Sequence, residues 1–175
     1  MRTLADLADA DHYLFTPSDP RALLPALSEP AFKTLLSRAV SGGDLARVCR
    51  GVYLYPQVDY PRGLVLFHAA ARLRADNFNY ISLETALSDA GVISQIPMNW
   101  ITLMSSGRSS TVRSGDWGTI EFVHTAQQPA DVASELEYDS RCHLWRASVK
   151  QALRDMRTTR RDMELIDKEQ LHESV

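Results

Sequence analysis

The chain has 175 residues, of which 45% are hydrophobic and 23% charged, and its formal net charge at pH 7 is −3. This composition is typical of a globular protein with a sizeable core, and the negative net charge excludes a general polyanion binder. Cys49 and Cys142 are the only cysteines and lie far apart in the chain, which argues against a zinc site or a disulfide framework. No run approaches the roughly 18 apolar residues of a transmembrane helix, and the N-terminus lacks the apolar stretch of a signal peptide. We therefore expect a cytoplasmic protein with no membrane partner.

Two short helices are predicted at the start of the chain. The first begins after Thr3 and closes against the core at residues 13–15. Thr16-Pro17-Ser18 combines a capping residue with a proline in the first turn, which is a helix-start signal. The second helix is accordingly expected over residues 19–24.

A third helix is predicted from Ser28, which is a good N-cap residue, and Pro30 lies in its first turn. Apolar residues then recur at helical spacing on one side of this helix: Phe32, Leu35, Leu36, Ala39 and Val40. Gly42 and Gly43 end the helix, because glycine readily adopts the left-handed conformation of a C-terminal cap.

Two short apolar runs follow, at residues 45–49 and 52–55, and Arg50-Gly51 between them predicts a tight hairpin turn. Three helices followed by a hairpin is the order of a winged helix-turn-helix, in which the third helix reads DNA and the hairpin is the wing. We assign this domain to residues 1–56.

Residues 57–61 are bracketed by prolines and predict a linker. A mixed α+β domain is expected over residues 62–175, so the fold class of the chain is α+β with an N-terminal winged helix-turn-helix. The predicted elements are a helix over 62–74, a helix over 83–90 capped by Ser82, a strand over 100–104, a loop over 105–116, a strand over 118–124 and a helix over 141–159.

The polar side of the third helix has the residues that a recognition helix needs. Short hydrogen-bonding side chains and an arginine can enter the major groove and read base edges, while a flanking lysine can contact phosphate. The candidate DNA-binding residues here are Lys33, Thr34, Ser37, Arg38 and Ser41. The alternative interpretation is an ordinary solvated helix face.

Arg47 and Arg50 lie on the predicted wing, where arginines contact phosphate or enter the minor groove. A solubilising hairpin tip is the alternative. Residues 1–60 contain six basic and seven acidic residues. Since phosphate contacts dominate affinity for DNA, this domain alone is expected to bind DNA weakly.

A third group of basic residues follows helical spacing near the C-terminus: Arg146, Lys150, Arg154, Arg157 and Arg161. On one helix they would lie within an arc of about 80°. Such a ridge can contact the phosphate backbone of DNA. Alternatively, these residues form ion pairs with the acidic segment 131–139 or with the acidic C-terminal tail, or they belong to a protein interface.

Signals of enzymatic chemistry are weak. The five histidines are scattered without metal-binding spacing, and the chain has no glycine-rich phosphate loop and no G-x-S-x-G motif. Glu135, Glu137 and Asp139 could bind magnesium, as in a nuclease, but a solvated acidic segment is favoured. We therefore expect no catalytic residue, no metal and no cofactor.

The chain resembles the AbiEi family of antitoxins from bacterial abortive-infection systems. The resemblance lies in four stretches in the same order, namely LLSRAVSGGDLARVCRGVYLYP, ISLETALSDAGVISQIP, WITLMSSGRSSTVRSGDWGTIEFVH and VKQALRDMRTTRRDMELID. It implies an N-terminal winged helix that binds inverted repeats in the promoter and represses its own operon. It also implies a C-terminal domain that counteracts a nucleotidyltransferase-like toxin, in a type IV toxin–antitoxin system whose two proteins need not form a complex. An antitoxin that binds its toxin directly through residues 62–175 is the alternative.

Overall fold

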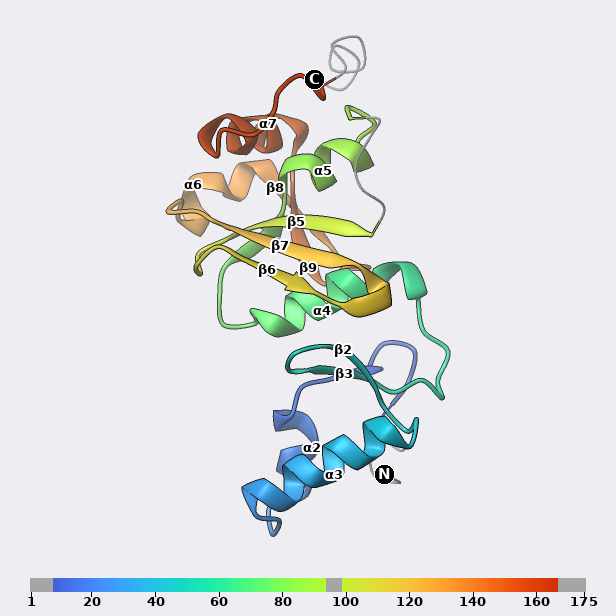
Figure 1. Cartoon of the computed structure of the whole chain (residues 1–175). Helices are drawn as coiled ribbons and strands as arrows, with labels where there is room; N and C mark the ends of the chain where they lie inside the picture. Colours follow the sequence, from blue (N-terminus) through green and yellow to red (C-terminus); the bar gives the residue numbers. More distant parts are fainter. Residues whose placement is uncertain (1–7, 94–98, 167–175) are drawn as a thin grey trace. The chain divides into compact units, whose positions relative to one another are not determined.

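A computed structural model describes residues 8–93 and 99–166, and its contacts divide the chain into two compact units, one ending at Leu73 and the other beginning at Arg74 (Figure 1). Helices and sheets occur in both units, so the mixed α+β class is confirmed. The division between the units comes later in the chain than the predicted linker at residues 57–61. The domain boundaries 1–56 and 62–175 stay a prediction.

The first unit has a small antiparallel sheet with the strand order β1-β3-β2. Its elements in chain order are β1 (Leu14–Phe15), α2 (Ser18–Leu23), α3 (Glu29–Ser41), β2 (Ala46–Cys49), β3 (Val52–Leu54), the short 3₁₀ helix η1 (Arg62–Leu64) and α4 (Val65–Leu73). The helix predicted over residues 62–74 is thus confirmed as η1 followed by α4.

Helix α3 begins and ends where the sequence predicts. The Ser28 hydroxyl accepts a hydrogen bond from the Ala31 amide at 3.4 Å, and Gly43 after the last turn has a φ of +79°, which favours glycine. Apolar residues of α3 pack against β1 and the start of β2 in one cluster, made of Phe15, Phe32, Leu36, Ala39 and Leu45. The buried side of this helix therefore agrees with the predicted periodicity.

The predicted hairpin is confirmed as β2 and β3, with the turn at Arg50-Gly51 and a φ of +85° at Gly51. The first helix predicted for the chain, which starts after Thr3, is wrong in its second half. Residues 1–7 lie outside the described residues, but residues 8–13 form no helix and β1 follows them. Leu14 pairs with Leu54 and Phe15 with Tyr53, because β3 satisfies the backbone groups of this buried segment.

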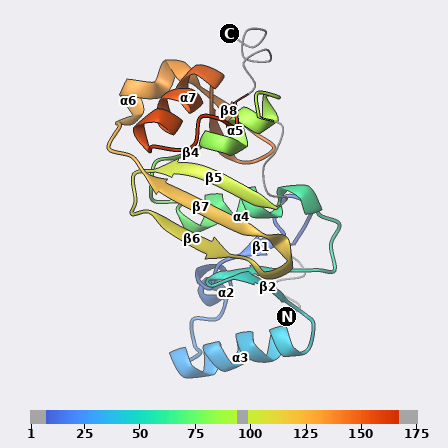
Figure 2. The same ribbon diagram turned by 45° about the horizontal axis from the view of Figure 1, so that its top comes forward.

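The second unit is a six-stranded mixed sheet with the strand order β6-β7-β5-β4-β9-β8. Its strands are β4 (Asn79–Ile81), β5 (Trp100–Ser105), β6 (Ser110–Arg113), β7 (Thr119–His124), β8 (Leu136–Asp139) and β9 (Leu144–Ala147). Its helices are α5 (Leu83–Asp89), η2 (Gly115–Trp117), α6 (Pro129–Val132), η3 (Ala133–Glu135) and α7 (Val149–Thr158). Helices α5 and α7 pack against each other on one face of the sheet (Figure 2).

Two predicted segments of this unit are wrong in part. The expected loop over residues 105–116 contains β6, which pairs with β7 along the edge of the sheet. The expected helix over residues 141–159 is interrupted, because β9 inserts between β4 and β8 and only then does Ser148 cap α7. The Ser148 hydroxyl accepts from the Gln151 amide at 3.1 Å, which starts the helix there.

A fully buried carboxylate connects α7 to the rest of this unit. Asp155 accepts hydrogen bonds from the Ser82 hydroxyl at 2.7 Å, from the side-chain amide of Gln127 at 3.0 Å and from the side-chain amide of Gln151 at 2.9 Å. Ser82 precedes α5 as predicted, but its hydroxyl donates to Asp155 and does not cap the helix. Burial and the nearby Asp155 raise the pKa of the Tyr80 hydroxyl, so this phenol stays neutral.

We expect Asp155→Ala to lower the free energy of unfolding by about 3 kcal/mol, because several buried donors lose their acceptor at once. Urea denaturation followed by circular dichroism measures this difference. Asp76→Ala is the matched control, since Asp76 is exposed, and it should change stability by no more than about 0.5 kcal/mol. Equal stability of the two variants would contradict the structural role of the Asp155 carboxylate.

Candidate nucleic-acid interface

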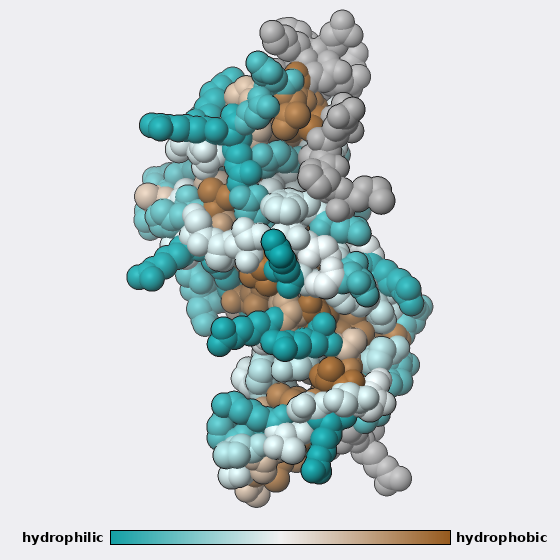
Figure 3. All heavy atoms as spheres, viewed as in Figure 1, coloured by the Kyte–Doolittle hydropathy of each residue, from teal (hydrophilic) through white to brown (hydrophobic). Residues whose placement is uncertain are grey.

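The polar side of α3 faces solvent. All five candidate residues on it are exposed: Lys33, Thr34, Ser37, Arg38 and Ser41. Figure 3 shows mostly hydrophilic or neutral residues over α3, at the bottom of the view. This side of the helix is therefore available to a ligand along its length.

Most of the hydrogen-bonding capacity on this face is unused. Thr34 donates to the carbonyl of Pro30 at 2.9 Å, and Lys33 lies 3.4 Å from Glu29 in a solvent-exposed pair. Such a pair contributes little to stability. Within the described part of the chain, the side chains of Ser37, Arg38 and Ser41 have no hydrogen bond or ion pair, so they can bind base edges without first breaking internal contacts.

The hairpin that follows this helix carries two further exposed arginines. Arg47 lies on β2, where its Nε donates to the Cys49 carbonyl at 3.4 Å, and Arg50 lies in the turn, without an ion pair to any described residue. The Leu45 amide donates to the Ala39 carbonyl at 3.1 Å, and both side chains belong to the core of this unit. The start of β2 is thereby fixed against the end of α3.

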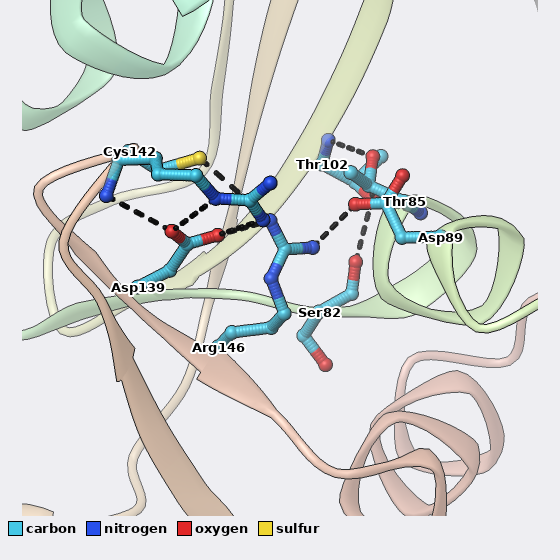
Figure 4. A network of polar contacts seen from close by, with 8 residues as sticks. Ser82, Thr85, Asp89, Thr102, Asp139, Cys142 and Arg146 are labelled. Carbon is cyan, nitrogen blue, oxygen red and sulfur yellow. Dashed lines mark hydrogen bonds and ion pairs between the residues drawn. The ribbon is translucent and has the colours of Figure 1, made fainter.

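Arg146 does not belong to a helical ridge, because it lies on β9. Its guanidinium bridges Asp139, at 3.0 Å, and Asp89 (Figure 4). Burial disfavours the charged form of this side chain, but the hydrogen bond that Arg146 donates to Asp139 and the charge of Asp89 outweigh that effect and raise the pKa of Arg146. Two carboxylates therefore already bind the guanidinium that was expected to contact phosphate.

Two more residues of the predicted ridge also form internal ion pairs. Lys150 lies 2.6 Å from Glu135. Arg161 follows the end of α7 and contacts Glu84 at 3.3 Å and Glu121 at 2.5 Å. The alternative prediction of ion pairs with the acidic segment 131–139 is therefore confirmed for Arg146 and Lys150. Arg161 is also ion-paired, but with Glu84 and Glu121, which were not predicted as partners.

Three arginines of this region remain exposed, and we call Arg154, Arg157 and Arg160 the α7 basic patch. Arg154 donates to the Gln151 side chain at 3.2 Å, and none of the three forms an ion pair with a described residue. Arg160 was not predicted as part of the ridge, because it follows the end of α7. Its own φ is +56°, so helical spacing does not apply there. Arg154 and Arg157 are therefore the members of the predicted ridge that remain exposed without an ion pair to a described residue.

Two carboxylates of the acidic segment, Asp139 and Glu135, bind basic side chains of the same unit. Burial opposes ionisation of Asp139, but hydrogen bonds from Arg141 and Arg146 outweigh it and hold the pKa of this carboxyl well below its usual range. Hydrogen bonds from Lys150 and Ser148 likewise lower the pKa of Glu135. Across residues 8–93 and 99–166, no group of three or more His, Cys, Asp or Glu side chains is arranged to hold a metal ion.

No protein-family model matches this chain, and no curated protein matches it either. The resemblance to the AbiEi family accordingly stays a prediction. Among the described residues, no helix is both long and apolar enough to span a membrane.

Proposed function

We propose that this protein binds double-stranded DNA through its first unit, with α3 as the recognition helix and the β2–β3 hairpin as the wing. The observation that carries the proposal is the exposed polar face of α3, whose serine and arginine side chains have no partner among the described residues. The hairpin that follows α3 carries the exposed Arg50 at its turn. In a DNA-binding protein of this kind, the short side chains of the recognition helix contact base edges and the arginines of the wing contact the DNA backbone.

The arrangement of the elements supports this proposal. A strand, two helices and a hairpin follow one another, and the first strand pairs with the last in a sheet of order β1-β3-β2. This order is that of a winged helix-turn-helix from its first strand onward. The polar face of α3 is opposite the side that packs on Phe15 and Leu45. The core therefore fixes the helix in place and leaves the polar face exposed.

Specificity and affinity are expected to come from different residues. The first unit carries nearly balanced charge, so α3 and the hairpin supply base recognition more than electrostatic attraction. In the second unit, the α7 basic patch is the candidate for additional phosphate contacts, since Arg146, Lys150 and Arg161 are held by carboxylates.

We further propose that the chain is an antitoxin that represses its own operon by binding inverted repeats in the promoter and counteracts a nucleotidyltransferase-like toxin. This part of the proposal follows from the resemblance to the AbiEi family. It includes no reaction catalysed by this chain.

Arg38→Ala and Arg50→Ala are each expected to weaken binding to the chain's own promoter DNA, by about fivefold to a hundredfold if the arginine reads a base, because a good bidentate contact contributes about 1–3 kcal/mol. Fluorescence anisotropy with a labelled promoter duplex measures the change. Arg72→Ala is the control, since it removes the same charge from α4. Unchanged affinity in both test variants would refute the assignment of these residues.

The double substitution Arg154→Ala with Arg157→Ala should weaken DNA binding to a similar extent for all sequences. If both residues contact phosphate, the slope of the logarithm of affinity against the logarithm of salt concentration should fall by about 2. Arg113→Ala, which removes an exposed arginine from β6, serves as the control. A slope that does not change would mean that the α7 basic patch does not contact DNA.

Expression of a nucleotidyltransferase-like gene next to the one for this chain should arrest bacterial growth, and co-expression of this chain should restore it. Colony counts after induction measure both effects. Arg38→Ala should lose repression of a promoter reporter and still restore growth, because the proposal assigns the two functions to different units. Growth arrest that this chain does not relieve would argue against the antitoxin function and leave DNA binding to be judged by the anisotropy measurements.

A further inference from the structure

The β8–β9 hairpin forms one edge of the six-stranded sheet. Strand β8 pairs with β9 on one side. Within the part of the chain that the structure describes, no strand pairs with its other side. An unpaired edge presents backbone N–H and C=O groups in the pattern that another strand requires.

Two exposed aromatic side chains lie on this hairpin. Tyr138 is 50% exposed and Trp145 is 44% exposed, and they face each other directly in the β8–β9 register. Their ring centroids lie 5.4 Å apart with an interplanar angle of 67°, which is a favourable edge-to-face arrangement. Exposed tyrosine and tryptophan on a rigid element are the residues that most often anchor protein interfaces.

The same edge carries both an acidic and a basic exposed side chain, so two copies of it can be complementary in charge. Glu137 is exposed and forms no ion pair with a described residue, while two positions further on Asp139 is bound by Arg141. The Arg141 side chain is 78% exposed. These residues line a pocket of about 320 Å³ together with Tyr138, Ser140 and Arg146.

We propose that β8 pairs with β8 of a second copy of this chain, antiparallel and about a twofold axis at Tyr138. In this register Glu137 of one copy lies opposite Asp139 of the other, next to the guanidinium of Arg141 that binds Asp139 there. The twofold axis produces this contact twice, as a symmetric interface between identical patches requires. Tyr138 and Trp145 of both copies then form a four-ring aromatic cluster across the new strand pair.

The interface is small, and this limits its strength. Four residues of strand span roughly 13 Å, and a stable dimer usually buries about 800 Å² on each partner. We therefore expect a reversible dimer with a dissociation constant of about 1–100 µM, in which the aromatic cluster contributes most of the binding.

Sedimentation equilibrium of the full chain over about a hundredfold range of concentration tests this proposal. The mass should rise from that of the 19.6 kDa monomer towards twice that value. Trp145→Ser and Tyr138→Ser should each shift the dissociation constant upwards at least about tenfold. Leu165→Ser is the matched control, because Leu165 is a similarly exposed hydrophobic residue, at 42%, outside the hairpin.

Charge exchange tests the proposed register. Glu137→Arg alone places a second guanidinium next to that of Arg141 of the other copy and should weaken the dimer. Arg141→Glu alone should weaken it by placing carboxylates together. The double variant exchanges the two charges and should recover part of the lost affinity. Circular dichroism of each variant verifies that the fold is retained.

A chain that stays monomeric at every concentration would overturn the proposal. A dimer that is insensitive to Trp145→Ser and Tyr138→Ser would also overturn it. Binding of the toxin to this hairpin, with the free chain remaining monomeric, would overturn it as well. The inference does not depend on DNA binding, because the measurements use the protein alone. Its failure would leave the anisotropy results on Arg38 and Arg50 unaffected.

Discussion

Asp155 carries a carboxylate that is completely buried and forms no ion pair with any described residue. An isolated buried charge is strongly unfavourable, and here a hydroxyl and two amides stabilise the group. The donors belong to the connection before α5, the segment after β7, and α7 itself. This one hydrogen-bonded group therefore connects α7 to the segment before α5 and to the segment after β7, and it helps to fix which side of α7 faces solvent.

A second physical constraint divides the basic residues into two classes. Arg146 and Arg161 are largely buried and each lies between two carboxylates, so their charge is neutralised within the protein. Arg38, Arg50, Arg154 and Arg157 are exposed and form no such pairs in the described part of the chain. Only the second class can contribute favourable electrostatic energy to binding a polyanion without losing an internal ion pair. Because the net charge of the chain is negative, the electrostatic part of the proposed DNA binding would depend on these few residues.

The proposed dimer through β8 and the proposed binding to an inverted repeat of DNA share the same twofold symmetry. A dimer formed through β8 has a twofold axis, and it contains two copies of the first unit. An inverted repeat has the same twofold symmetry, and dimeric helix-turn-helix proteins use this correspondence to bind two half-sites. A weak dimer would make binding to a second half-site depend on protein concentration, as the proposed repression of its own operon requires.

Local sequence alone determined much of the first unit. Ser28, Gly43 and Gly51 mark the ends of α3 and the hairpin turn, since capping and positive φ angles depend on single residues and their neighbours. The spacing of Phe32, Leu36 and Ala39 likewise revealed the buried side of α3, because helical periodicity is a local property. The exposed polar face could be predicted for the same reason.

Tertiary structure decided what local pattern could not. The spacing of Arg146 with Lys150 and Arg154 is helical, but pairing of β9 with β4 and β8 outweighs that preference and places Arg146 on a strand. The same pairing brings Asp89 and Asp139 to its guanidinium, across 57 and 7 residues of sequence. Leu14 and Phe15 form a strand for an equivalent reason, since β3, some forty residues later, provides their hydrogen-bond partners. Which of the ridge residues lie outside internal ion pairs is therefore a property of the folded sheet, because long-range contacts place a carboxylate beside Arg146, Lys150 and Arg161 and leave Arg154 and Arg157 exposed.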